Sequence, residues 1–203
     1  MNPKEIAKIL VDIEAVKLSF EKPFQWVSGI ESPIYCDNRL IISDVEGRRK
    51  IAKAFADKIK AQYPDTNLIA GTATAGIPHA AWVAEELNLP MLYVRSKAKE
   101  YGTKSLIEGK FQEGQSCVLI EDLISTGKSS VAALQALKAE GLAVKKVYSI
   151  FSYGLKKADE KFKEADFEFE SLSQVESLID YGVESGFLSE SNTNQLRSFF
   201  SSL

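Results

Sequence analysis

The stretch that decides the fold reads VLIEDLISTGKSS and covers residues 118–130. Its first residues are apolar and rich in β-branched side chains, which predicts a buried strand that ends in Glu121 and Asp122. From Val131 onward, apolar residues recur at helical spacing. The segment between the two acids and this helix therefore lies at a strand-to-helix crossover, the place where α/β sheets bind ligands.

The crossover segment has the chemistry of a phosphate cradle. Thr126, Gly127, Lys128 and Ser129 would direct backbone N–H groups and hydroxyls at an anion, helped by the positive end of the helix dipole. The adjacent carboxylates would repel that anion unless they face something else, and sugar hydroxyls or a Mg²⁺ shell are natural partners for such oxygens. The stretch therefore indicates a phosphorylated sugar. It is not a Walker A motif, because the first glycine of that motif would fall at Asp122.

One structural alternative stays open, an ordinary strand–turn–helix connection in which Ser125 or Thr126 caps the helix. A cap needs neither acid, so a ligand site is favoured. The order acid, acid, apolar, any residue, Ser/Thr, Thr/Ala, Gly, any residue, Ser/Thr resembles the 5-phosphoribosyl-1-pyrophosphate (PRPP) motif of type I phosphoribosyltransferases. The resemblance implies that residues 125–129 and both acids bind PRPP, and that Ser125 also reaches the pyrimidine.

Composition limits the remaining possibilities. The chain has 203 residues, of which 45% are hydrophobic, so it suits one α/β domain and buries roughly 70% of its extended-chain surface. A net charge of -3 gives no global basic field for nucleic acid. The sequence has no apolar run of about 18 residues for a membrane span. Two cysteines without metal-ligand spacing indicate neither a disulfide framework nor a zinc site, and a reducing cytoplasm is expected.

A second motif lies near the N-terminus. After a predicted N-terminal helix, residues 16–20 alternate as a strand, and residues 24–27 could pair with residues 34–36 in a small antiparallel unit. Residues 24–39, with SG at 28–29, SPIY at 32–35 and DNR at 37–39, resemble the N-terminal hood of orotate phosphoribosyltransferases. The resemblance implies that Tyr35 and Arg39 bind orotate. Packing of Tyr35 and a surface salt bridge of Arg39 are the plain alternatives. Many members have lysine where this chain has Val27, which leaves the orotate carboxylate to Arg39 or to backbone donors.

A second anion loop follows the next strand. Residues 68–70 read as a buried strand, and the small residues of 71–78 let a ligand approach the backbone before a helix that begins near Pro78. A tight turn that needs small residues is the alternative. In the resembled family this loop contacts pyrophosphate, which implies roles for Thr74 and Ala75, although some members carry lysine at the position of Ala75. His79 is the only histidine, and a structural or surface role is expected for it.

A basic, glycine-punctuated loop follows the predicted strand at residues 91–94. Residues 95–110 hold five basic side chains against two acidic ones, which favours a mobile lid over a merely solvated loop. The loop resembles the flexible catalytic loop of the family, in which Lys99 would be catalytic. Members commonly have histidine at the position of Tyr101. The residues implied to bind PRPP or pyrophosphate here are Arg95, Lys97, Lys99 and Tyr101.

The remaining segments complete an α/β pattern. Helices are predicted from Ser43 to about Gln62 and over residues 132–139, a strand over residues 144–151, and helices over residues 172–181 and 188–200. The alternation of strands and helices predicts a mainly parallel sheet with helices on both faces. The resemblance covers nearly the whole chain and implies the type I phosphoribosyltransferase fold in one domain over residues 1–203. Its hood spans about residues 1–40, with a contribution from the C-terminal segment, and its core spans about residues 41–170.

The resemblance also implies a reaction. PRPP and orotate would give orotidine 5′-monophosphate and pyrophosphate, with Glu121 and Asp122 holding ribose hydroxyls, and with Lys99 and both acids as the catalytic set. It implies Mg²⁺ bound mostly through PRPP oxygens, with no metal-ligating residue in the chain, and a homodimer that shares the catalytic loop. No nucleic-acid or membrane partner is expected.

Two other activities stay open. One is transfer to a purine or to uracil, against which the hood motif argues. The other is a regulator that keeps the fold without the chemistry. Against the regulator, the chain lacks a helix-turn-helix extension and retains Lys99.

Overall fold

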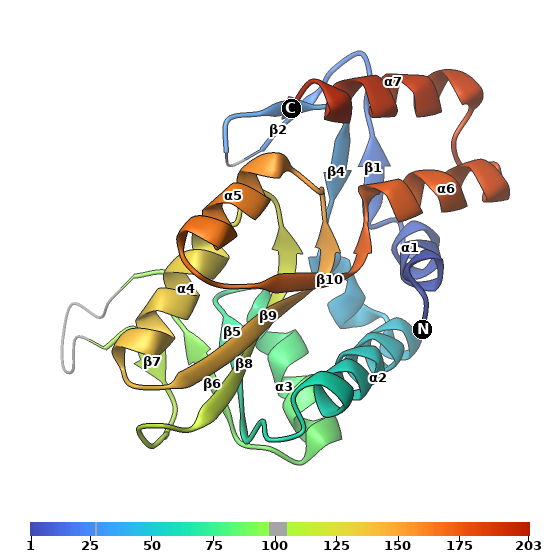
Figure 1. The fold of residues 1–203 in the computed structure, drawn as a ribbon. Coiled ribbons are helices and arrows are strands. Elements are labelled where there is room, and N and C mark those ends of the chain that lie inside the picture. The colour runs from blue at the N-terminus through green and yellow to red at the C-terminus, as the bar shows by residue number, and fades with distance from the viewer. Residues whose placement is uncertain (27, 98–104) are drawn as a thin grey trace.

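The protein is built around one six-stranded sheet (Figure 1), seen in a computed structural model that describes residues 1–26, 28–97 and 105–203. In spatial order the strands are β10 (Phe169–Gln174), β9 (Ala143–Ser152), β8 (Ser116–Ile124), β5 (Leu68–Thr72), β6 (Met91–Val94) and β7 (Ile107–Glu108). All neighbours pair in parallel except β7, which is antiparallel to β6. The predicted mainly parallel sheet is confirmed.

Helices cover both faces of this sheet. On one face α2 (Val45–Gln62) and α3 (Gly76–Leu87) share a core with Ile69 and Ile120. On the other face α4 (Lys128–Ala139) and α5 (Lys156–Glu164) share a core with Leu68 and Leu119. Because both faces are covered, residues 117–120 of β8 are apolar toward both faces, which is why they could be recognised as a strand. No helix in the described ranges has the length and apolarity that crossing a membrane requires.

The strand order reverses between β5 and β8. The chain passes from β5 to β6 in one direction, then returns across β5 to β8, and β9 and β10 continue in the opposite direction. The carboxyl ends of β5 and β8 therefore diverge into loops that lead to helices on opposite faces, α3 and α4. Such a switch point leaves a crevice at the carboxyl ends of the strands, where ligands of open α/β sheets bind.

The hood, which we define as residues 1–40, differs from the prediction in its pairing. It contains α1 (Pro3–Asp12), β1 (Val16–Leu18), β2 (Phe24–Gln25), β3 (Glu31–Ser32), β4 (Ile34–Cys36) and the start of the 3₁₀ helix η1 (Asn38–Ser43). The predicted pairing of residues 24–27 with 34–36 is wrong, because β2 pairs with β3 and β4 pairs with β1. The reason is a tight turn, in which Trp26 N–H donates to the Ile30 carbonyl and Gly29 N–H donates to the Trp26 carbonyl. This turn folds β2 back before β4 begins.

The C-terminal segment lies beside the hood, and the red helices and blue strands meet at the top of Figure 1. The last helices are α6 (Val175–Ser185) and α7 (Glu190–Ser201). The Trp26 ring stacks on Tyr153 with ring centroids 4.0 Å apart, and Phe200 of α7 stacks on Tyr153 at 6.2 Å. The predicted helix over residues 172–181 is wrong at its start, since Leu172 belongs to β10. This edge strand reads FESLSQ and is half-exposed, so it lacks an apolar run.

Candidate active site

The central strand extends further than predicted. The sequence predicts that it ends at the two acids, but β8 continues to Ile124, because Glu121, Leu123 and Ile124 still pair with β9. The loop is therefore confined to residues 125–127. Since alternate side chains of a strand point to opposite faces, Glu121 is buried at 4% exposure whereas Asp122 is only half-buried.

The first acid is held in a fixed position from two sides. Ser130 Oγ, in the first turn of α4, donates to Glu121 Oε2 at 3.1 Å, and the Asp122 N–H donates to Oε1 at 3.1 Å. Burial raises the pKa of Glu121 well above its ordinary value, and the neighbouring carboxylate of Asp122 raises it further. Ser130 was not singled out from the sequence. The feature that could have indicated it is its hydroxyl side chain at the last position of the central motif, where the helix begins.

The second acid has the same electrostatic character. Burial raises the pKa of Asp122 as well, against hydrogen bonds that lower it and against the charge of Arg39. Within the described residues neither acid forms an ion pair with a lysine or arginine. Two adjacent carboxylates without an ion pair among the described residues are poised to gain from a positively charged ligand or from hydroxyl donors.

The loop after β8 leaves the start of α4 uncapped. Gly127 takes the N-cap position with φ of 72° and makes no side-chain capping bond, so the alternative in which Ser125 or Thr126 caps the helix is wrong. A side chain at Gly127 would place its Cβ 2.8 Å from the Phe162 ring, so only glycine fits. The buried Ser125 Oγ has no hydrogen-bond partner among the described residues. Uncapped N–H groups and a free hydroxyl form an anion-binding end.

The loop after β5 brings a second helix start to the same place. Thr74 is exposed, Ala75 is partly buried, and α3 begins at Gly76, two residues before the expected start near Pro78. Proline is tolerated in a first helical turn, so Pro78 does not fix the boundary. A Cβ on Gly76 would come within 2.7 Å of the Ile120 carbonyl oxygen, so α3 starts directly against the strand that carries both acids.

Of the two roles expected for His79, structural or surface, the structure supports the structural one. It is 2% exposed, its ring meets Trp82 edge-on with centroids 5.5 Å apart, and neither ring nitrogen has a hydrogen-bond partner among the described residues. Burial lowers the pKa of His79 to about 4, so the ring is neutral at neutral pH.

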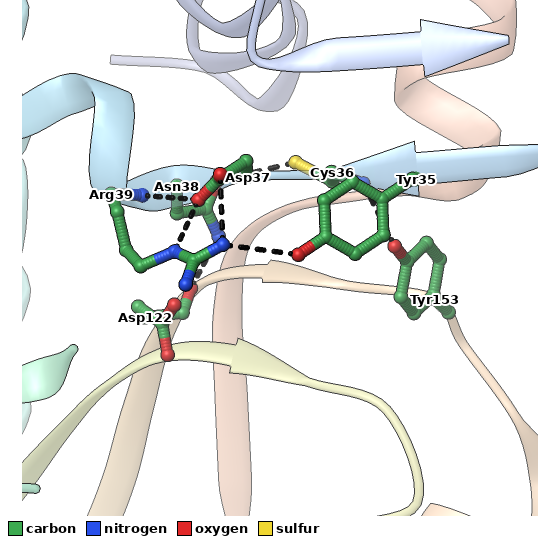
Figure 2. A network of polar contacts seen from close by, with 7 residues as sticks. All are labelled: Tyr35, Cys36, Asp37, Asn38, Arg39, Asp122 and Tyr153. Carbon is green, nitrogen blue, oxygen red and sulfur yellow. Dashed lines mark hydrogen bonds and ion pairs between the residues drawn. The ribbon is translucent and has the colours of Figure 1, made fainter. Parts of the chain in front are cut away.

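The hood places a cation, Arg39, near Asp122 (Figure 2). Arg39 Nε and Nη2 donate to the two Asp37 carboxylate oxygens at 2.6 and 2.8 Å, and Nη2 also donates to Tyr35 Oη at 3.1 Å. The side-chain bond from Arg39 holds the pKa of Asp37 below its ordinary value. Figure 2 shows the guanidinium between Asp37 and Asp122. Arg39 therefore forms a salt bridge with Asp37, as the structural alternative for this residue predicted. The remaining guanidinium nitrogen, Nη1, has no hydrogen-bond partner among the described residues.

The structure covers only part of the predicted lid. Arg95 directly follows β6, its N–H donates to the Leu106 carbonyl at 2.8 Å, and its side chain donates to Glu108 at 3.3 Å. Lys97 is exposed. Lys99 and Tyr101 lie outside the described residues, as does Val27.

A separate groove of about 840 Å³ opens at the other end of the sheet, where β9 and β10 begin. None of the predicted site residues lines it. Its charged side chains are three lysines and three acids, namely Lys138, Lys145, Lys163, Asp159, Asp166 and Glu168. This balance of charge distinguishes the groove from the crevice at the switch point.

Comparison with known proteins agrees with this geometry. Residues 42–185 match the family described as Phosphoribosyl transferase domain. The orotate phosphoribosyltransferase of Fusobacterium nucleatum is 53% identical over 94% of this chain and 91% of that protein, and that of Bacillus subtilis is 50% identical over 96% and 90%.

Solved structures give the same result. The UMP synthase of Leishmania donovani has a TM-score of 0.85 and 28% identity over 98% of this chain and 42% of that one. The orotate phosphoribosyltransferase of Aeropyrum pernix has a TM-score of 0.76 and 26% identity over 91% of this chain and 99% of that one. With the predicted fold class confirmed by these matches, the chain belongs to the phosphoribosyl transferase domain family and, within it, to the orotate phosphoribosyltransferases.

Proposed function

We propose that this protein transfers the phosphoribosyl group of PRPP to orotate, which gives orotidine 5′-monophosphate and pyrophosphate in pyrimidine biosynthesis. The observation that carries the proposal is the set of groups gathered at the switch point. There two carboxylates without an ion pair among the described residues lie beside the uncapped start of α4, and the Arg39 guanidinium lies near one of them, Asp122. A phosphorylated sugar and an anionic base fit these groups.

The phosphates would be bound by the two loops and the lid. Thr126, Gly127, Lys128 and Ser129 hold the 5-phosphate at the start of α4, with Ser125 beside them. The pyrophosphate meets the start of α3 at Thr74 and Ala75. The lid residues assigned to its charge are Arg95, Lys97, Lys99 and Tyr101. Two observations support these assignments. The starts of α3 and α4 both lie next to β8, and Arg95 directly follows β6, the strand beside β5.

The acids would act on the ribose. Departure of pyrophosphate leaves positive charge at the anomeric carbon, and preorganised opposite charge is an effective way to stabilise it. Glu121 and Asp122 hold the ribose hydroxyls and face this charge. Their raised pKa values mark a site where the ionised carboxylates are destabilised without a ligand, so a developing cation is bound more strongly than the ground state.

The hood would bind the base. Arg39 Nη1 is the donor assigned to the orotate carboxylate, and Tyr35 Oη lies next to it. Because Asp37 holds the other edge of the guanidinium, the donor is fixed before orotate arrives. The division of the chain into a hood over about residues 1–40 and a core over about residues 41–170 belongs to this proposal.

Mg²⁺ fits the donor set of the crevice. The described residues hold no group of three His, Cys, Asp or Glu side chains that could cage a metal. The two adjacent carboxylates carry negative charge that would attract such an ion, while oxygens of PRPP and of water would supply its ligands. The bound ion would neutralise charge on the pyrophosphate.

A first experiment measures loss of orotate absorbance with PRPP and Mg²⁺, with uracil, adenine and hypoxanthine in parallel. We expect turnover of orotate alone. Turnover of another base would overturn the assignment of the hood, and PRPP binding without turnover would favour a regulator. The variant Lys99→Ala should lower kcat roughly 10²- to 10³-fold. The matched control Lys50→Ala, an exposed lysine of α2, should not, and an unchanged kcat in Lys99→Ala would contradict the lid assignment.

We also propose a homodimer in which each lid serves the partner's site. Leu40, Ile42 and Val45 are exposed apolar side chains where η1 meets α2, next to the hood, and they support an interface there. Light scattering measures the mass. Mixing the two inactive variants Lys99→Ala and Asp122→Asn should restore activity, because each mixed dimer then has one complete site. Mixing without recovery would contradict a shared lid.

The cytoplasmic location also stays a proposal. Both cysteines, Cys36 and Cys117, are free and buried, as expected in a reducing compartment. Fractionation of cells that express the protein tests it.

A further inference from the structure

Asn38 connects the hood to the strand that carries the acids. It is 1% exposed, and its Nδ2 donates to the main-chain oxygen of Asp122 at 2.7 Å. Its Oδ1 accepts a hydrogen bond from Cys36 Sγ at 3.2 Å. A buried amide whose two ends are both used is costly to replace, because either partner would be left unsatisfied.

The same contacts continue to a second strand of the sheet. The Cys36 N–H donates to Tyr153 Oη at 3.0 Å, and Tyr153 directly follows β9. Figure 2 shows the run from Tyr153 through Cys36 and Asn38 to Asp122. Strand β4 of the hood is therefore attached to the ends of both β9 and β8.

The neighbours of Asn38 explain why this attachment matters for the reaction. Asp37 and Arg39, the residues on either side, form the charged pair of the base site. The Asn38 amide meanwhile holds the backbone of Asp122. A single residue thus sets the distance between the donor for orotate and the acid for ribose. Bond formation requires the reacting atoms at about 3–3.5 Å, and a displacement of about 1 Å can cost about 10²-fold in rate.

We propose that Asn38 is a positioning residue that fixes the base site of the hood against the ribose site of β8. This inference rests on the proposed function and deepens it. Asn38 contacts neither substrate in this assignment. It acts through the backbone of Asp122 and through the chain on either side of itself.

Two variants test the inference. Asn38→Leu has a similar size and removes both hydrogen bonds, whereas Asn38→Asp keeps the acceptor and replaces the donor. Both should lower kcat about 10²-fold, while calorimetric affinity for PRPP, which the phosphate loops dominate, stays near that of the wild type. An unchanged kcat, or a loss explained by PRPP affinity alone, would overturn the inference.

The pH dependence of Asn38→Asp separates positioning from packing. The introduced carboxyl can donate to the Asp122 oxygen only when protonated, so the ratio of its kcat to the wild-type kcat should rise as pH falls. The ionisable groups drawn around it in Figure 2 are Tyr35, Cys36, Asp37, Arg39, Asp122 and Tyr153, and they are present in both proteins. The ratio for Asn38→Leu should not rise. A ratio that is flat for both variants would mean that the donor has no role.

Controls separate the possible failures. Asn194→Asp makes the same chemical change on the exposed surface of α7 and should leave kcat unchanged. If Asn38→Leu does not fold, the isosteric Asn38→Asp carries the test. Wild-type turnover of orotate in the same assay tests the proposed function itself, so failure there is distinct from failure of the Asn38 variants.

Discussion

Glu121 and Glu170 are glutamates on strands of the same sheet, but the charges beside them differ in sign. Glu121 lies beside a carboxylate, whereas Glu170 lies beside lysines. Glu170 of β10 forms an ion pair with Lys58, accepts from Gln62 at 3.1 Å and lies 3.6 Å from Lys146. Burial alone would raise the pKa of Glu170, yet the hydrogen bonds from Lys58 and Gln62 outweigh it and the pKa is lowered. For Glu121, burial and the charge of Asp122 raise the pKa.

The surroundings of Glu170 form a saturated network, which we call the polar cluster: Lys58, Gln62, Lys146, Tyr148 and Glu170. Tyr148 Oη donates to Gln62 Oε1 at 2.7 Å, and Lys146, only 12% exposed at its side chain, also pairs with Glu168 at 3.3 Å. Each charge in the cluster has an opposite charge beside it. At the crevice the buried Ser125 hydroxyl has no hydrogen-bond partner among the described residues, and neither acid forms an ion pair with them.

The polar cluster therefore stabilises the folded protein, whereas the two adjacent carboxylates of the crevice destabilise it. Satisfied polar groups hold α2 against β9 and β10, whereas unsatisfied groups gather where the strand order reverses. Active sites commonly carry such destabilising arrangements. Removing a charge should therefore raise stability at the crevice and lower it in the polar cluster, and it should lower activity only at the crevice.

The largest effect is expected at the crevice. Asp122→Asn should lower kcat roughly 10²- to 10³-fold, because a charge facing the transition state is lost. It should also raise the melting temperature of the ligand-free protein by about 2–4 °C, since a half-buried charge beside Glu121 disappears. Steady-state kinetics and calorimetry measure the two. A parallel loss of activity and stability would break the comparison.

The next effect concerns the backbone of the crevice. Gly127→Ala should destabilise the protein by about 2–4 kcal/mol, from the positive φ of 72° together with the clash against Phe162. Gly114 has φ of +81°, and a Cβ added there would meet nothing within 4 Å, so Gly114→Ala isolates the φ cost at about 1–2 kcal/mol. Urea unfolding of both variants gives the difference. Equal losses would show that Phe162 moves away at no cost.

A smaller effect is expected in the polar cluster. Glu170→Gln should lower the free energy of unfolding by about 1 kcal/mol, a value discounted for the partial exposure of this side chain. Its kcat with orotate should match the wild type, because the cluster lies away from the crevice. Urea unfolding and the orotate assay test this. A fall in kcat would show that the two regions are coupled.

The smallest effect is a dependence on pH. A carboxyl whose pKa is lowered by folding stabilises the folded state above its unfolded pKa and loses this contribution as pH falls through the folded pKa. The stability difference between wild type and Glu170→Gln should therefore be present at neutral pH and shrink below about pH 4. A difference that persists unchanged in acid would assign it to packing rather than charge.

The sequence predicted the parts of this molecule that depend on local pattern. The apolar run before Glu121 and the helical spacing after Val131 determine a buried strand and its helix, and the motif between them located the crevice. The lid residues Lys99 and Tyr101 and the roles of all site residues remain predictions. The fold class followed from the alternation of strands and helices together with the family resemblance.

Tertiary contacts decided what the sequence did not reveal. Strand β10 is polar on its exposed side, so nothing in FESLSQ marks it until β9 pairs with it. The hood pairing depends on turn hydrogen bonds at Trp26, which override the order of the apolar segments. Ser130 and Asn38 were visible as polar residues within the motifs. Their partners were not, because Asn38 bonds to Asp122 far along the chain and Ser130 bonds to Glu121 across the loop between β8 and α4.

The stacking of α7 on the hood sets an order of events during synthesis on the ribosome. Trp26 and Tyr153 meet Phe199 and Phe200, which are translated more than forty residues after Tyr153. The hood precedes these partners in the chain, and Phe199 and Phe200 emerge well after the last strand of the sheet. Folding of the sheet can therefore begin before α7 packs beside the hood, so the hood should become ordered after the sheet.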